Sequence, residues 1–97
     1  MANVNINNMV FAIRENTLDR YILGEINQYL KRISLNKNDI WLDAGSQIGT
    51  FTVHSSKSVK NIISIEPDDD NFSLLESNIV KNNLTNVITI KAAIVGN

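Results

Sequence analysis

The chain has 97 residues, enough for one small domain, and its 43% hydrophobic and 20% charged residues are the balance of an ordinary globular protein. Nine basic and ten acidic residues leave a net charge of −1, which gives no reason to expect nucleic acid as a partner. No cysteine is present for a disulfide or a thiolate metal site, no apolar run approaches membrane-spanning length and the start does not read as a signal peptide. We therefore expect a cytoplasmic protein that does not contact membranes.

The first seventeen residues are expected to precede the main fold as a tail or an edge strand. Asparagine alternates with apolar residues over Met1–Asn8, and Met9–Arg14 favours a short strand. A helix is predicted over Leu18–Ile33, because its apolar residues recur at intervals of three and four and form one stripe. The single domain is thereby divided into residues 1–17 and an αβαβαβ unit over residues 18–97.

The stretch 40–51, IWLDAGSQIGTF, predicts a strand, a tight turn and the start of a helix. Its first three residues are apolar, as in a parallel strand that is buried on both faces, and Asp43 ends this run. Gly45 and Gly49 follow, and glycine lets a ligand come close to the main chain. A short helix is predicted over residues 48–58. In open α/β sheets ligands bind at such a junction, outside the carboxyl ends of the strands.

The spacing of the glycines narrows the class of ligand. The dinucleotide pattern G-x-G-x-x-G, counted from Gly45, would need glycine at Gln47 and at Thr50. The phosphate-binding pattern G-x-x-x-x-G-K-S/T fails as well, because Thr50 and Phe51 stand where glycine and lysine should be. The remaining pattern, D-x-G-x-x-x-G, suits a nucleoside ligand that carries no phosphate.

A second β-rich run, Asn61–Glu66, also ends in a carboxylate and is followed by Pro67. An acidic residue about 20 positions beyond a glycine turn is the usual partner of a ribose diol. Glu66 can accept hydrogen bonds from both ribose hydroxyls, and such charge-assisted bonds are the stronger kind. The turn and Glu66 together predict a nucleoside site.

The rest of the chain continues the alternation of helix and strand. A helix is predicted from Pro67 to Lys81, and the three aspartates at 68–70 complement its dipole without a metal ion. His54 stands alone in the sequence, and we expect it on the surface or in packing contacts. A third strand is predicted over Val87–Ala93. Alternation of this kind implies a parallel sheet with right-handed crossovers.

Three segments together resemble the FkbM family of methyltransferases, which belong to the Rossmann-like class that depends on S-adenosyl-L-methionine (AdoMet). The segments are LDAGSQIGTFT, ISIEPDDDNFSLLESNI and NNLTNVITIKAA, and the resemblance covers residues 40–93. It implies an α/β fold with a Rossmann-like three-layer parallel sheet and AdoMet as the cofactor. The cofactor-binding residues that it implies are Asp43, Gly45, Ser46 and Gly49 around the methionine part, Glu66 on the ribose and Pro67 near the adenine.

The chain departs from this family in two respects. Ser46-Gln47 stands where the family has Ala-Asn, a conservative change within the turn. The chain also ends before the family's fourth strand, so we expect a sheet truncated after the third strand and a bare edge beside residues 40–43. Exposed edges pair with other chains. We therefore expect self-association, or a partner that completes the sheet.

The resulting interpretation is the cofactor-binding half of an AdoMet-dependent methyltransferase. The resemblance implies methyl transfer to a hydroxyl of a small molecule or glycan, and neither a general base nor a metal site is assigned. Two alternatives stay open: a non-catalytic module that binds adenosyl-nucleosides, and a truncated fragment that serves only assembly. A dinucleotide oxidoreductase is a more distant alternative because of the glycine spacing.

Overall fold

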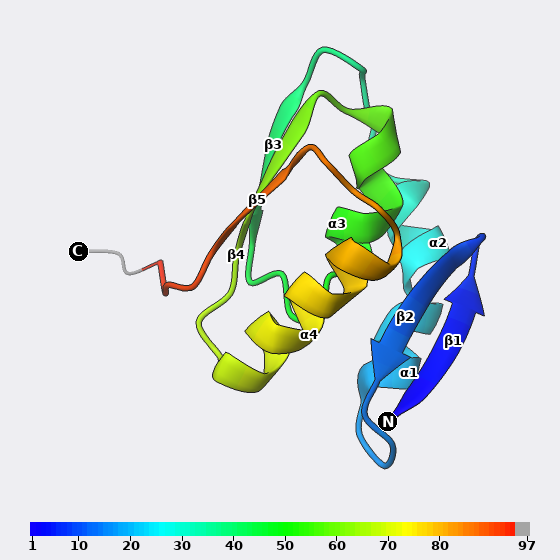
Figure 1. Ribbon diagram of the computed structural model, residues 1–97. Helices are drawn as coiled ribbons and strands as arrows, with labels where there is room; N and C mark the ends of the chain where they lie inside the picture. Colours follow the sequence, from blue (N-terminus) through cyan, green and yellow to red (C-terminus); the bar gives the residue numbers. More distant parts are fainter. Residues whose placement is uncertain (95–97) are drawn as a thin grey trace.

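The computed structural model describes residues 1–94 of the chain, which form two sheets and a set of short helices. The elements, in chain order, are β1 (Ala2–Ile6), β2 (Met9–Ile13), α1 (Asp19–Gly24), α2 (Ile26–Leu30), β3 (Ile40–Ala44), α3 (Thr50–Ser55), the 3₁₀ turn η1 (Ser56–Ser58), β4 (Asn61–Ile65), α4 (Asp69–Lys81) and β5 (Val87–Ile90). Figure 1 shows the parallel sheet on one side of the molecule and the β1–β2 hairpin on the other, with α3 and α4 between them.

The sheet that carries the predicted site is parallel, with strand order β3-β4-β5. Leu42 lies opposite Ile63, and Ile63 lies opposite Ile88, so the three strands are in register. This arrangement confirms the predicted α/β fold with a Rossmann-like parallel sheet. Within the described residues no strand pairs with the far side of β3, as expected for a sheet edge.

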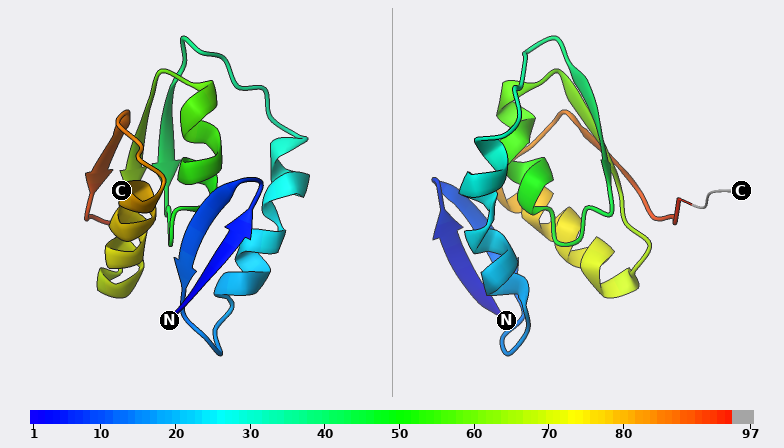
Figure 2. Two further views of the ribbon diagram at one scale, coloured as in Figure 1. Left: turned by 45° about the vertical axis from the view of Figure 1, so that its right-hand side comes forward. Right: turned by 180° about the vertical axis from the view of Figure 1, so that it is seen from behind.

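The helices cover only one face of this sheet (Figures 1 and 2). Strand β3 alternates accordingly: Ile40 and Leu42 are 63% and 57% exposed, whereas Trp41 and Asp43 are half-buried on the helix side. The expectation that this strand is buried on both faces is therefore wrong for the described residues. Its apolar run fits burial on both faces, but no described element packs against the outer one.

The N-terminal residues form an antiparallel hairpin instead of a tail or an edge strand of the main sheet. Asn7 and Asn8 both have positive φ angles, 53° and 64°, which is the requirement of the tightest hairpin turns. Two successive asparagines between alternating apolar residues are the signal that could have predicted this hairpin. Its second strand, β2, packs against α4, and its residues Phe11, Ala12 and Ile13 contribute to the buried core.

The predicted helix over residues 18–33 is shorter than expected and broken. It divides into α1 and α2 at Glu25, whose N–H donates to Ile22 O, three residues back, in a tighter turn than the α-helix makes. Of the predicted stripe only Leu23 and Ile26 are buried. The third helical segment also begins later than predicted, at Thr50, because residues 45–49 form the turn. No helix in the described part of the chain has both the length and the apolar character needed to span a membrane.

Helix α4 agrees most closely with its prediction, apart from its first two residues. Asp68 is the N-cap, and its side chain accepts from Asn71 N at 2.9 Å. Asp69 and Asp70 occupy the first turn, where acidic side chains favour the helix dipole. The helix therefore starts after Pro67, and the aspartates have the helix-start role that the sequence indicated.

Candidate functional site

The turn after β3 is held open by three residues in left-handed backbone conformations. Gly45, Gln47 and Gly49 have φ angles of 73°, 52° and 97°. The N–H groups of Gly45 and Ser46 both donate to Ile65 O, at 2.8 and 3.0 Å, which fixes the turn against the end of β4. A Cβ at position 49 would lie 2.9 Å from Leu75 Cδ1, so Gly49 is required both by its φ angle and by the approach of α4.

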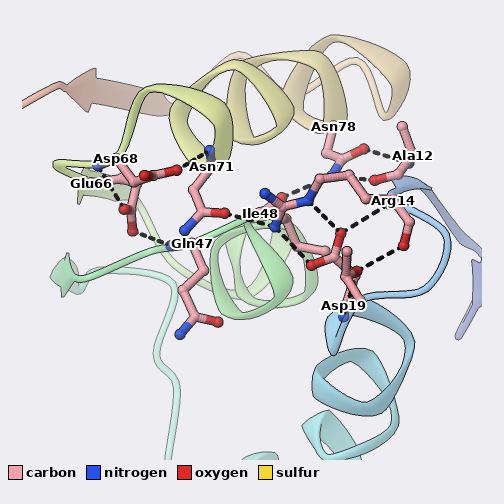
Figure 3. A network of polar contacts seen from close by, with 10 residues as sticks. Ala12, Arg14, Asp19, Gln47, Ile48, Glu66, Asp68, Asn71 and Asn78 are labelled. Atoms are coloured by element: carbon pink, nitrogen blue, oxygen red, sulfur yellow. Dashed lines mark hydrogen bonds and ion pairs between the residues drawn. The ribbon is translucent and has the colours of Figure 1, made fainter. Parts of the chain in front are cut away.

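Glu66 lies beside this turn, as the sequence predicted. Its side chain is buried, with Oε1 accepting from Gln47 N at 2.6 Å and Oε2 accepting from Asp68 N at 3.0 Å (Figure 3). The carboxylate thus connects the turn after β3 with the start of α4. A carboxylate offers about four acceptor positions, and these two hydrogen bonds occupy one position on each oxygen.

Asp43 points to the helix side of the sheet, below the turn. Its Oδ2 accepts from Thr52 Oγ1 at 2.7 Å, and Thr52 Oγ1 in turn lies 2.6 Å from Ser64 Oγ. Burial raises the pKa of Asp43 above its ordinary value, the hydrogen bond from Thr52 opposes this, and the nearby charge of Glu66 adds to the increase.

The remaining predicted cofactor residues have different surroundings. Ser46 is buried, its Oγ donates to Asp43 O at 2.7 Å and its carbonyl accepts from Gly49 N at 3.0 Å, so it stabilises the turn from within. Pro67 is exposed between Glu66 and the N-cap of α4. The adenine contact expected of Pro67 stays a prediction.

A cavity of about 400 Å³ opens beside the turn, within the usual range for small-molecule sites. It is lined by Ile22, Glu25, Ile26, Tyr29, Asp43, Ala44, Gly45, Ser46, Gln47, Thr50 and Phe51. Three predicted site residues, Asp43, Gly45 and Ser46, line it, whereas Gly49 and Glu66 support the turn from outside the cavity. A larger cavity of about 520 Å³ lies between the hairpin and α4 and touches none of the predicted site residues.

The wall that α1 and α2 contribute to the cavity was missed in the sequence. The break at Glu25 places Glu25 and Tyr29 beside the glycine turn. The Tyr29 ring packs edge-on against Phe51 at a centroid distance of 5.6 Å. No local signal predicted this, because the stripe of residues 18–33 indicated packing alone. Thr50 was missed too: its hydroxyl is buried at the cavity wall and has no hydrogen-bond partner in the described part of the chain.

A hydrogen-bonded network joins the site to the N-terminal hairpin (Figure 3). Arg14 forms two side-chain bonds to the buried carboxylate of Asp19, at 2.8 and 2.9 Å, and donates to Asn71 Oδ1 at 2.8 Å. The hydrogen bonds of Arg14 hold the pKa of Asp19 below its ordinary value. Asn71 N donates to the Asp68 side chain, and Asp68 N donates to Glu66 Oε2. A chain of hydrogen bonds therefore runs from Arg14 to the carboxylate that is predicted to bind the ribose.

His54 has a packing role. Its Nδ1 lies 2.8 Å from Thr50 O, its Nε2 lies 3.3 Å from Ile6 O, and its ring stacks on Phe11 at 5.2 Å. Among the residues that the structure describes, no group of three or more His, Cys, Asp or Glu side chains could hold a metal ion.

No known protein-family model matches the chain, so the FkbM assignment is not supported by a family match. Among curated proteins, a probable ribosomal RNA small subunit methyltransferase A of Methanosphaera stadtmanae is 32% identical over 78% of this chain and 29% of the relative. The 23S rRNA (uracil(1939)-C(5))-methyltransferase RlmD of Aliivibrio fischeri is 36% identical over 64% of this chain and 14% of the relative. The chain therefore spans less than a third of the length of either relative.

The fold is also that of a solved methyltransferase. The tRNA (uracil-54, C5)-methyltransferase of Pyrococcus abyssi, solved with S-adenosyl-L-homocysteine, matches with a TM-score of 0.74 and 17% identity, over 95% of this chain and 24% of that one. In a chain of 97 residues this coverage leaves about five residues unmatched, so most of the N-terminal hairpin is included. The chain thus resembles methyltransferases in sequence and has the fold of one that was solved with S-adenosyl-L-homocysteine, which supports the expected enzyme class and cofactor.

These comparisons overturn the expected substrate. A small-molecule or glycan hydroxyl and the absence of nucleic acid were inferred, yet both curated relatives are rRNA methyltransferases by name, and the solved neighbour is a tRNA methyltransferase. The inference from a net charge of −1 fails for two physical reasons. The sum covers a chain that spans less than a third of the length of each relative. A sum also ignores where on the surface the charges lie.

Proposed function

We propose that this chain provides the AdoMet-binding part of a methyltransferase that acts on RNA. The observation that carries the proposal is the junction of the glycine turn with Glu66 at the carboxyl ends of β3 and β4. Here a backbone shaped by left-handed residues meets a buried carboxylate that accepts one backbone N–H on each oxygen. Such a junction is suited to a ribose and its attached methionine chain, and the adjoining cavity is large enough for a small ligand.

The residues of the chain would bind and orient the cofactor. Glu66 would accept from the ribose hydroxyls, since each of its oxygens binds one backbone N–H and has a further position free. Gly45 and Ser46 form the wall of the cavity along which the methionine part would lie. When bound, AdoMet supplies an activated methyl group, and orientation of that group toward the acceptor is the main catalytic contribution that we assign to this chain.

RNA as the substrate class is supported by the rRNA relatives and by the tRNA-modifying neighbour. The neighbour's match extends over most of the N-terminal hairpin as well as the Rossmann-like core. The acceptor atom is not assigned. Membership of the FkbM family within the AdoMet-dependent class rests on the motif residues alone and stays a finer prediction.

Titration of S-adenosyl-L-homocysteine into the Glu66→Gln variant tests the assignment. The amide keeps the shape of the carboxylate but loses charge-assisted acceptance, which contributes about 1.5–3 kcal/mol per bond. We expect calorimetry to show binding weakened by at least about tenfold. The matched control is Glu76→Gln on the exposed side of α4, which should bind as the wild type does. Equal affinity of the Glu66→Gln variant and the wild type would refute the ribose role.

A further inference from the structure

The net charge of −1 conceals a separation of charge along the parallel sheet. At the carboxyl ends of the strands lie Asp43, Glu66 and the three aspartates of residues 68–70. Five of the nine basic residues belong to the connections at the opposite end, before β3 and before β4. They are Lys31, Arg32, Lys37, Lys57 and Lys60, and we call them the basic end. Figure 2 shows that the connection before β3 starts at α2 and reaches the connection before β4 at one end of the sheet.

Hydrogen bonds fix these connections to one another. Lys60 N donates to Asp39 O at 2.8 Å, and Lys37 Nζ donates to Lys57 O at 2.8 Å. The side chain of Asn86, just before β5, donates to Ser56 O at 2.7 Å, which joins the third connection to the other two. A polar cavity of about 500 Å³ lies between them, lined by Lys37, Ser56, Lys57, Val59, Asn83, Leu84, Thr85 and Asn86. Lys37, Lys57 and Lys60 thus belong to connections that are hydrogen-bonded to one another.

The charges of the basic end are not neutralised within the described residues. All five side chains are exposed. The ion pairs of the described residues are Arg14–Asp19 and Lys91–Asp69, and none of the five residues takes part in them. Asp39 is the one acidic residue in these connections, and its carboxylate accepts from Asn36 N and Trp41 Nε1. A surface of this kind attracts polyanions, and amide and hydroxyl groups beside lysines bind phosphate oxygens.

We propose that the basic end is an RNA-binding surface that contacts the phosphate backbone. The proposal rests on the proposed function in its choice of RNA as the polyanion. A five-residue strand spans roughly 16 Å, so this surface would hold nucleotides that flank the acceptor rather than the acceptor itself. Lys91 offsets part of the acidic charge at the opposite end, and the remaining difference in charge favours phosphates at the basic end.

Fluorescence anisotropy with a labelled single-stranded RNA at several salt concentrations tests the surface. The variant is Lys37→Gln/Lys57→Gln, which removes both cavity-lining lysines. The control is Arg20→Gln/Lys91→Gln, which lowers the net charge equally outside the basic end. We expect the slope of log Kd against log salt to fall by about 1.4 in the variant, for two lost contacts to a single strand, and to change little in the control.

Three results would overturn the proposal: no measurable RNA binding by the wild type, the same slope in variant and wild type, or an equal loss in the control. Tighter binding of phosphatidylserine vesicles than of RNA would likewise overturn it, in favour of a membrane surface. Calorimetric titration of the same variant with S-adenosyl-L-homocysteine keeps the two proposals apart. The cofactor cavity lies at the opposite end of the sheet, so its affinity should equal that of the wild type whichever way the RNA result falls.

Discussion

Gln47 has a left-handed backbone, with φ at 52°, that is unfavourable for a residue with a long side chain. Its N–H donates to Glu66 Oε1, so the turn requires this conformation. Replacing Gln47 by glycine should raise the free energy of unfolding by about 0.5–1 kcal/mol. The change relieves the backbone strain, and the greater conformational entropy of glycine in the unfolded chain cancels part of that gain. Urea denaturation measures the difference. The matched control, Gln28→Gly in the exposed part of α2, should instead lose about 1 kcal/mol. Equal losses in both variants would contradict the left-handed turn.

Thr50 has a buried hydroxyl at the wall of the cavity with no hydrogen-bond partner among residues 1–94. A buried polar group without a hydrogen bond is costly, so we expect this hydroxyl to bind the ligand. Thr50→Val keeps the shape and should leave the unfolding free energy unchanged or higher, while weakening calorimetric binding of S-adenosylhomocysteine severalfold. Thr52→Val is the contrasting control, since its hydroxyl bonds to Asp43 and Ser64 and its loss should destabilise the fold. Unaltered ligand affinity in Thr50→Val would exclude the contact.

At the scale of elements, two asparagine side chains of α4 form hydrogen bonds with backbone groups of β2, as a neighbouring strand would. Asn78 Oδ1 accepts from Ala12 N at 2.7 Å and Asn78 Nδ2 donates to Ile48 O at 2.8 Å, while Asn82 bonds to both backbone groups of Val10. Asn78→Ala would leave buried backbone groups unpaired and should lower the unfolding free energy by at least about 2 kcal/mol. Thermal or urea unfolding tests this against Ser73→Ala on the exposed side of the same helix, for which a change within about 0.5 kcal/mol is expected. Similar stabilities of the two variants would show that these amide bonds contribute little.

The elements predicted correctly from the sequence are those whose signals are local. β3, β4 and α4 each combine a continuous pattern with a clear end, such as Asp43 or the aspartates at the start of α4. The helix predicted over residues 18–33 fails because apolar spacing does not reveal the break at Glu25. Asn78 could not be found either, because its partners lie 30 and 66 residues away in the chain. Tertiary hydrogen bonds of this kind have no local signature.

At the scale of the whole molecule, the predicted site is formed by segments that lie far apart in the sequence. The sequence located the turn and Glu66, because a motif with fixed spacing carries its own geometry. It could not supply the cavity wall from α1 and α2, or the polar chain from Arg14 to Glu66, since both depend on how the N-terminal segment packs. The prediction from charge is limited in the same way. The net charge follows from composition alone, whereas the positions of the acidic and basic residues relative to the sheet depend on the fold.

Ligand choice is a property of the folded molecule and can be measured through its stability. A ligand that binds only the folded state raises its stability by about 2.7 kcal/mol at a concentration of 100 times Kd, and each kcal/mol shifts Tm by about 4–8 °C in a domain of this size. S-adenosylhomocysteine at such a concentration should therefore raise Tm by at least about 10 °C. NAD and ATP at the same concentration should shift Tm little, because Gln47 and Thr50 stand where a dinucleotide turn needs glycine and the phosphate-binding pattern fails as well. Differential scanning fluorimetry gives the three shifts side by side, and Glu66→Gln should reduce the first of them. A larger shift with NAD than with S-adenosylhomocysteine would mean that the left-handed backbone of Gln47 admits a pyrophosphate, and the glycine spacing would then be wrong as a guide to the ligand.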